Sequence, residues 1–172
     1  MPTTLACELR ASLAWLFQDA LDLSTVSDAS KLDYSQSLAN GVAADQADQI
    51  WHDQRTVAAG ADDDLDLTAL ASSFFGGSIS ISLAQLKGLL LVNTSSTAGD
   101  KLRLDSSVAN ACTGPFGGSA SSQIEVGADS PLLLASKKDG WPVTGGSGDI
   151  LRIHNPGGNA ITYKIVLVGT SS

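Results

Sequence analysis

Apolar and polar residues alternate along the first part of the chain. From Cys7 to Phe17 the odd positions are mostly apolar, whereas even positions carry polar residues such as Glu8 and Arg10. This two-residue period is typical of a β-strand with one buried face. A helix is the alternative, because four apolar residues also share one helical face: Leu9, Leu13, Leu16 and Phe17. The more regular alternation favours the strand.

The next segments combine turn signals with a second alternating stretch. Residues 24–30 are small and polar, which predicts a loop. Residues 31–38 alternate again, with Leu32, Tyr34 and Leu38 on one face. The Asn-Gly pair at residues 40–41 indicates a turn. The Ala- and Asp-rich residues 43–49 allow one short helical turn.

The rest of the chain consists of short apolar segments joined by Gly-, Ser- and Asp-rich connections. Nine segments have the length and composition of strands: residues 49–58, 64–68, 78–83, 87–93, 101–104, 123–127, 132–135, 149–154 and 160–168. Many short strands punctuated by turn-forming residues are typical of an antiparallel sandwich or barrel. We therefore predict an all-β fold, with an antiparallel sandwich over residues 41–172 and an N-terminal arm over residues 1–40.

The last two predicted strands flank a loop rich in turn-forming residues. The connection Asn-Pro-Gly-Gly-Asn at residues 155–159 contains proline, which fixes φ, and two glycines that permit positive φ. Two alternating segments around such a loop predict a β-hairpin. Its second strand is apolar on nearly both faces after Lys164, so it should be central, with Tyr163, Ile165 and Leu167 in the core.

Charge and composition narrow the possible partners. The net charge is −8, and ten Lys and Arg are spread without a basic cluster. An acidic surface repels nucleic acid and anionic lipid, so we expect neither as a partner. No stretch reaches the 18 apolar residues of a membrane span, and the N-terminus lacks a secretory pattern. These features predict a protein made in the cytosol and kept there until assembly or lysis.

No motif for chemistry stands out. His52 and His154 lack neighbouring ligands at zinc spacing, and the acidic residues 62–66 lack the pattern of a calcium loop and predict a solvated loop. Serine-nucleophile and phosphate-loop motifs are missing. We predict no catalytic, cofactor-binding or metal-binding residues. Cys7 and Cys112 form no CxxC pair; two free thiols are favoured, and a disulfide stays open.

Two stretches of the chain resemble a known class of protein. They are residues 31–41 (Lys-Leu-Asp-Tyr-Ser-Gln-Ser-Leu-Ala-Asn-Gly) running on through residues 44–57, and residues 148–155 with 161–170. They resemble small structural proteins encoded among the virion genes of tailed bacteriophages. Several such proteins are similar to viral jelly-rolls. The resemblance implies a jelly-roll-like, non-enzymatic virion protein, a capsid decoration (cement) protein above all, located in the virion after synthesis in the host cytoplasm.

Three alternatives to a decoration protein remain. One is a tail- or fibre-associated virion protein. Another is a lectin-like carbohydrate-binding module. The missing secretion pattern and the aromatic content of 5% count against this alternative. The least favoured is an enzyme whose pocket is built from scattered Asp residues.

The N-terminal arm supplies the candidate assembly residues. Five large apolar side chains lie close together there, and exposing them is unfavourable by about 25 cal/mol per Å² of apolar surface. These are Leu13, Trp15, Phe17, Leu21 and Leu23. The arm can fold back onto its own domain or pack on a neighbour, and identical neighbours favour the latter. We therefore predict a homo-oligomer, for example a trimer, that also binds the major capsid protein or another virion protein.

Overall fold

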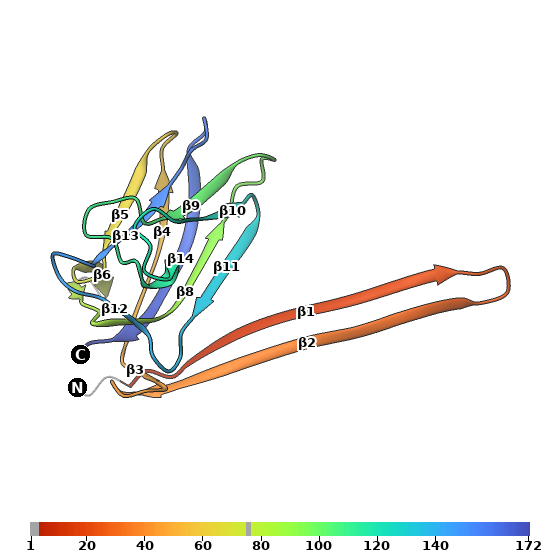
Figure 1. Ribbon diagram of the computed structural model, residues 1–172, viewed down its shortest axis with the longest axis horizontal. Coiled ribbons are helices and arrows are strands. Elements are labelled where there is room, and N and C mark those ends of the chain that lie inside the picture. Colours follow the sequence, from red (N-terminus) through yellow and green to blue (C-terminus); the bar gives the residue numbers. More distant parts are fainter. Residues whose placement is uncertain (1–3, 75–76) are drawn as a thin grey trace.

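The structure, a computed structural model, describes residues 4–74 and 77–172. Within this part of the chain, the only helical segment is one short 3₁₀ turn, η1 (Gly114–Phe116). Two regions are visible in Figure 1: a β-sandwich and a long two-stranded arm that leaves its base. The predicted all-β class is confirmed.

The sandwich consists of two antiparallel sheets. The larger sheet has the order β11 (Ser130–Ala135), β8 (Gln85–Asn93), β14 (Ile161–Thr170) and β4 (Gln49–Val57), with β12 (Trp141–Pro142) also paired to β8. The smaller sheet has the order β10 (Gln123–Gly127), β9 (Lys101–Asp105), β13 (Ile150–His154) and β5 (Asp62–Asp66). These two orders are those of an eight-stranded jelly roll. The predicted jelly-roll-like antiparallel sandwich is therefore confirmed.

One continuous core fills the space between the sheets. On β14 the alternate residues Tyr163, Ile165 and Leu167 are all almost completely buried, as the sequence predicts. Leu89 and Leu91 on the neighbouring β8 are also fully buried, and the smaller sheet contributes leucines and isoleucines from β9 and β13. The core therefore lies wholly within the sandwich.

The predicted hairpin between the last two long strands is wrong. β13 pairs with β5 and β9, whereas β14 pairs with β4 and β8. The loop after His154 thus crosses from one sheet to the other. The fully buried Asn155 fixes this crossing, because its side-chain amide donates to the carbonyl oxygens of Val57, Ala58 and Asn159 at 3.2, 3.1 and 2.7 Å.

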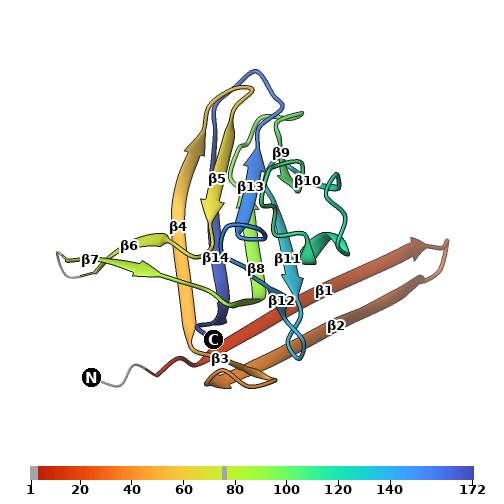
Figure 2. The ribbon, with the colours of Figure 1, turned by 60° about the vertical axis from the view of Figure 1, so that its left-hand side comes forward.

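A second hairpin projects from the sandwich on the side opposite the arm (Figure 2). It consists of β6 (Leu70–Phe74) and β7 (Gly77–Ile81), which pair antiparallel. The sequence prediction contained β7 but not β6. The indole nitrogen of Trp51 donates to the carbonyl oxygen of Ala71 at 2.8 Å, so this tryptophan of the core also anchors the base of the hairpin.

The acidic run, which the sequence predicted as a solvated loop entering the strand over residues 64–68, lies wholly within strand β5. Asp63 accepts hydrogen bonds from Arg55 at 2.7 and 2.8 Å and from the Tyr163 hydroxyl at 2.9 Å. Burial alone would raise the pKa of Asp63, but these hydrogen bonds and the guanidinium charge lower it below its usual value. On the same strand, Asp64 pairs with Arg152 and Asp62 with His154. The carboxylates are held by cross-strand partners rather than by water alone.

The predicted short helical turn over residues 43–49 is also wrong. This segment contains bends, one turn and the two-residue strand β3 (Gln46–Ala47). β3 runs parallel to the end of the arm, where Ala39 lies opposite Gln46. Ala47 is completely buried, so the segment joins the arm to the sandwich.

Candidate assembly surface

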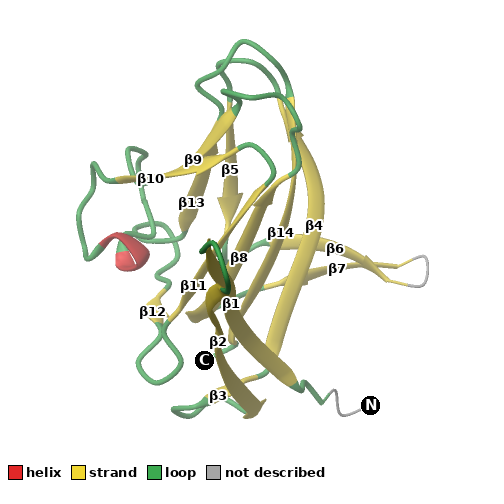
Figure 3. Cartoon of the chain, turned by 90° about the vertical axis from the view of Figure 1, so that its right-hand side faces the viewer, coloured by secondary structure: helices red, strands yellow, loops and turns green. Residues whose placement is uncertain are grey.

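The N-terminal arm is a long, regular β-hairpin. Strands β1 (Cys7–Ala20) and β2 (Thr25–Asn40) pair antiparallel from Cys7 opposite Leu38 to Ala20 opposite Thr25. The loop predicted over residues 24–30 is wrong, because the turn at the tip is residues 21–24 and β2 begins immediately after it. Most of the arm extends away from the sandwich (Figure 1), and Figure 3 looks along the arm from the side of its tip.

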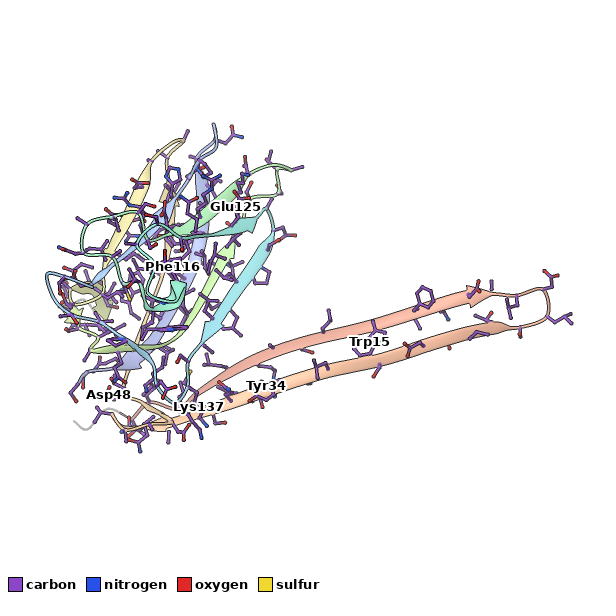
Figure 4. The ribbon with its side chains drawn as sticks, in the orientation of Figure 1. Trp15, Tyr34, Asp48, Phe116, Glu125 and Lys137 are labelled. Atoms are coloured by element: carbon purple, nitrogen blue, oxygen red, sulfur yellow. The ribbon has the colours of Figure 1, made fainter. Side chains whose placement is uncertain are left out.

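One face of the arm is apolar along most of its length. The odd residues of β1 and the even residues of β2 share this face because paired residues lie on the same side of a sheet. Its largest exposed side chains are Leu13, Trp15, Phe17, Val26, Leu32 and Tyr34, between 42% and 73% exposed. Figure 4 shows Trp15 and Tyr34 on the two strands. The indole nitrogen of Trp15 donates to Asp28 at 3.3 Å, which orients the ring on the ribbon.

The opposite face of the arm is mostly polar. Arg10 contacts Glu8 at 3.3 Å and Lys31 contacts Asp33 at 2.7 Å, and all four residues occupy this face in the strand register. Leu16, 63% exposed, is its single large apolar side chain. The arm is therefore amphipathic, although neither face is covered over its outer part.

The base of the arm is packed against the sandwich. Leu5, Cys7 and Leu9 contact a small second core formed by Leu38, Ala47 and Val168, with Val166 beside it. Gly88 permits this approach, because a Cβ atom there would lie 3.1 Å from the methyl groups of Leu9. The residues that pack here are the first members of the apolar face of the arm. That face therefore begins as an internal contact and continues as an exposed surface.

The larger sheet presents a second exposed apolar surface, which we call the outer face. Its central row runs across three strands through Leu133, Leu90 and Val166, which are cross-strand partners and half-buried. Flanking rows add Val92, between Pro131 and Lys164, and Ile50 beside Val168, which the base of the arm buries. These residues alternate with the core positions and so point away from the core.

The arm and the outer face enclose an open cleft of about 740 Å³. Its lining comes from residues 6–12 at the start of the arm and from β4, β8, β11 and β14. Glu8 and Arg10, which pair with each other, are the charged residues of this lining. A mainly apolar cleft whose two charges neutralise each other is suited to another apolar surface rather than to a charged ligand.

The five predicted assembly residues all lie on the exposed part of the arm. Leu13, Trp15 and Phe17 share the apolar face, and Leu21 and Leu23 lie at the tip, where Leu23 is completely exposed. The sequence reasoning missed Val26, Leu32 and Tyr34 as members of this surface. The alternation of Leu32 and Tyr34 is visible in the sequence, but only the register with β1 places them on the same face.

The thiols and the histidines do not assemble into a reactive centre. Cys7 and Cys112 are free: Cys7 lies in the base of the arm and Cys112 in the main core. Burial raises the pKa of the Cys112 thiol to about 11 and also raises the pKa of Cys7, so both favour the neutral form. Across residues 4–74 and 77–172, no three His, Cys, Asp or Glu residues are grouped to hold a metal ion. Among the described residues no helix is long and apolar enough to cross a membrane.

This chain shows little similarity to known proteins. No family model matches the chain, and no curated protein matches it. A solved structure of a mitogen derived from Yersinia pseudotuberculosis is similar over 72% of this chain and 88% of the mitogen, with 15% identity and a TM-score of 0.34. A likeness this weak carries no information about what the chain binds.

Proposed function

We propose that this chain is a non-enzymatic structural protein that assembles through its N-terminal arm, as a decoration protein on a bacteriophage capsid. The exposed amphipathic hairpin supports this proposal most strongly. A two-stranded hairpin alone is at best marginally stable in water, and this one has large apolar side chains on its exposed part. A partner that covers the apolar face would stabilise the ribbon.

Self-assembly is the simplest way to supply that partner. Every copy carries the same apolar arm, and a particle surface presents copies at high local concentration. The outer strand edge of the arm supports the same interpretation. From Ala11 to Gln18, β1 has no charged residue and no proline, whereas natural edge strands usually carry such residues to prevent pairing.

The placement in a virion is supported by the sequence resemblance and is compatible with the fold. Jelly rolls occur in viral capsid domains and in lectins, so the fold alone does not separate these functions. The exposed apolar face of the arm favours an assembly function over glycan binding, because a glycan-binding module does not need such a surface. A tail position remains the second candidate within the particle.

The oligomeric state tests the assembly function. We expect light scattering and sedimentation to show that the full-length protein is an oligomer, more strongly so at high salt because screening weakens the repulsion from the net charge of −8. The double variant Leu13→Glu/Phe17→Glu places two charges on the apolar face and should be monomeric.

The matched control is Ser12→Glu/Ala14→Glu, which adds the same charge to the polar face of the same strand. It should assemble like the wild type. A wild-type protein that is monomeric at high salt, or a Leu13→Glu/Phe17→Glu variant that assembles normally, would overturn the assembly function.

Antibody labelling of purified phage particles that carry the gene tests the position. Label over the capsid shell supports decoration, whereas label on the tail replaces it with the tail-associated alternative. Particles without label would reject both.

A further inference from the structure

We propose that the outer face of the larger sheet is the docking surface for the arm of a second copy of this chain. This inference rests on the proposed arm-mediated assembly and names its receptor. The docking residues are the central row Leu133, Leu90 and Val166, with Ile50 and Pro131 beside it.

The chain itself already contains the start of this contact. Leu9 packs over Gly88 of β8, and Cys7 lies in the cluster of Val166 and Val168 on β14. Apolar residues of the arm are thus complementary to the outer face at the one place where the two meet. Farther out the arm diverges from the sheet (Figure 1), and the apolar residues of the arm and of the outer face no longer contact each other.

A second copy can supply the contact between the outer part of the arm and the outer face that is missing within one molecule. Leu13, Trp15 and Phe17 cannot reach their own outer face while the base of the arm remains packed, because β1 leads them away from the sandwich. The same side chains of another molecule can reach this outer face, because the base of their arm is packed on a different sandwich. The central row has no charged member, so an apolar ribbon is a better occupant than a charged peptide.

The size of the contact is also suitable. Ten residue pairs, from Ala11 to Ala20, lie beyond the packed base of the arm. They form a ribbon about 33 Å long and about 10 Å wide at normal strand spacings, so one face covers roughly 330 Å². Each copy would give one arm and receive another. The total is then roughly 660 Å² per copy, within the roughly 600–1,000 Å² that each partner buries in a standard stable interface.

Charge placed on the outer face tests the proposal. The variant Ile50→Glu/Leu133→Glu changes one residue on each edge strand of the sheet, Leu133 of the central row on β11 and Ile50 of a flanking row on β4. We expect its self-association to weaken at least tenfold, to the level of the Leu13→Glu/Phe17→Glu arm variant. The control Gln54→Glu/Thr162→Glu adds the same charge to outward positions of the same sheet, at Thr162 beyond the apolar rows and at Gln54 beside Lys164 on the edge strand β4, and should assemble normally.

Mixing the two defective variants gives a sharper result. The arm variant has an intact outer face, and the outer-face variant has an intact arm. If the arm docks on the outer face, a tagged copy of one should capture the other, although neither captures itself. If the arms instead pack on each other, the outer-face variant assembles like the wild type and the mixture forms no complex, which overturns this inference and leaves arm-mediated assembly standing.

Cross-linking gives an answer that does not depend on the outer-face variants folding. A photoreactive benzoyl-phenylalanine replaces Phe17 in one isotopically labelled copy, which is mixed with unlabelled wild-type protein. Intermolecular cross-links should fall on peptides that contain Leu90, Leu133 or Val166. Cross-links confined to arm peptides of the other copy would reject the docking surface, whereas a wild-type monomer without intermolecular cross-links would reject the assembly function as well.

Discussion

The sandwich and the arm differ in how far they bury their apolar side chains. In the sandwich, Leu89 and Leu167 are fully buried between two sheets. In the arm, Leu13 and Phe17 stand on an equally regular strand but are 68% and 73% exposed. The strand pattern is the same in both regions. The difference lies in whether a second layer covers it.

This contrast shows which region can be stable alone. A sheet is stabilised mainly by the apolar area that it removes from water, and the sandwich provides that area within one chain. The arm has a complete hydrogen-bonded ladder yet covers its apolar face only at the base, with Leu9. The apolar face of its outer part has no covering layer within one molecule.

The largest effect is expected from a leucine of the sandwich. Leu89→Ala should lower the free energy of unfolding by about 2–5 kcal/mol, because it leaves a cavity in a fully buried site. Chemical denaturation of dilute protein measures this change. Lys164→Ala on the outward side of β14 is the control and should have little effect; equal losses at both positions would contradict the assignment of the two faces.

A smaller effect is expected where the chain crosses between the sheets. Asn155→Ala removes a fully buried amide that donates to three carbonyl oxygens, so these acceptors lose a partner. We expect a loss of about 1–3 kcal/mol in the free energy of unfolding, the usual cost of unsatisfied buried groups. Asn159→Ala, which removes one side-chain hydrogen bond to Asp100, is the comparison variant and should cost less. Similar losses in both would mean that Asn155 does not hold the crossing.

The ionised Asp63 makes part of the stability depend on pH. The pKa of this carboxyl is lower in the folded than in the unfolded protein, so its contribution is complete above the unfolded pKa of about 4. It is lost as the pH falls through the lower folded pKa. Asp63→Asn should therefore destabilise the protein by about 1 kcal/mol at neutral pH, since Arg55 loses the closer of its two charged partners. Denaturation at several pH values should show the difference from wild type shrinking below pH 4; a constant difference would contradict this origin.

The smallest effect is expected for a leucine of the arm. Leu13→Ala in dilute, monomeric protein should change the free energy of unfolding by no more than about 0.5 kcal/mol, as is usual for exposed sites. It makes the same chemical change as Leu89→Ala, so the two variants compare the two regions directly. A loss of 2 kcal/mol or more would show that the arm folds back onto its own sandwich in solution.

The sequence by itself determined most of the strands and the character of their faces. The period of two in residues 7–17 marked the arm, and Tyr163, Ile165 and Leu167 marked the centre of the larger sheet. Alternation is a local property, because neighbouring residues of a strand point to opposite sides whatever the strand pairs with. The five candidate assembly residues were visible in the sequence too, as apolar side chains concentrated in a short segment.

Only the tertiary structure decided which strands pair and which apolar faces remain uncovered. A Pro-Gly-Gly loop is compatible both with a hairpin and with a crossing, and the contacts of the buried Asn155 with distant residues such as Val57 accompany the crossing. The outer-face row of Leu133, Leu90 and Val166 comes from three strands far apart in the sequence. Such a surface depends on contacts between distant residues, and these form only when the whole chain has folded.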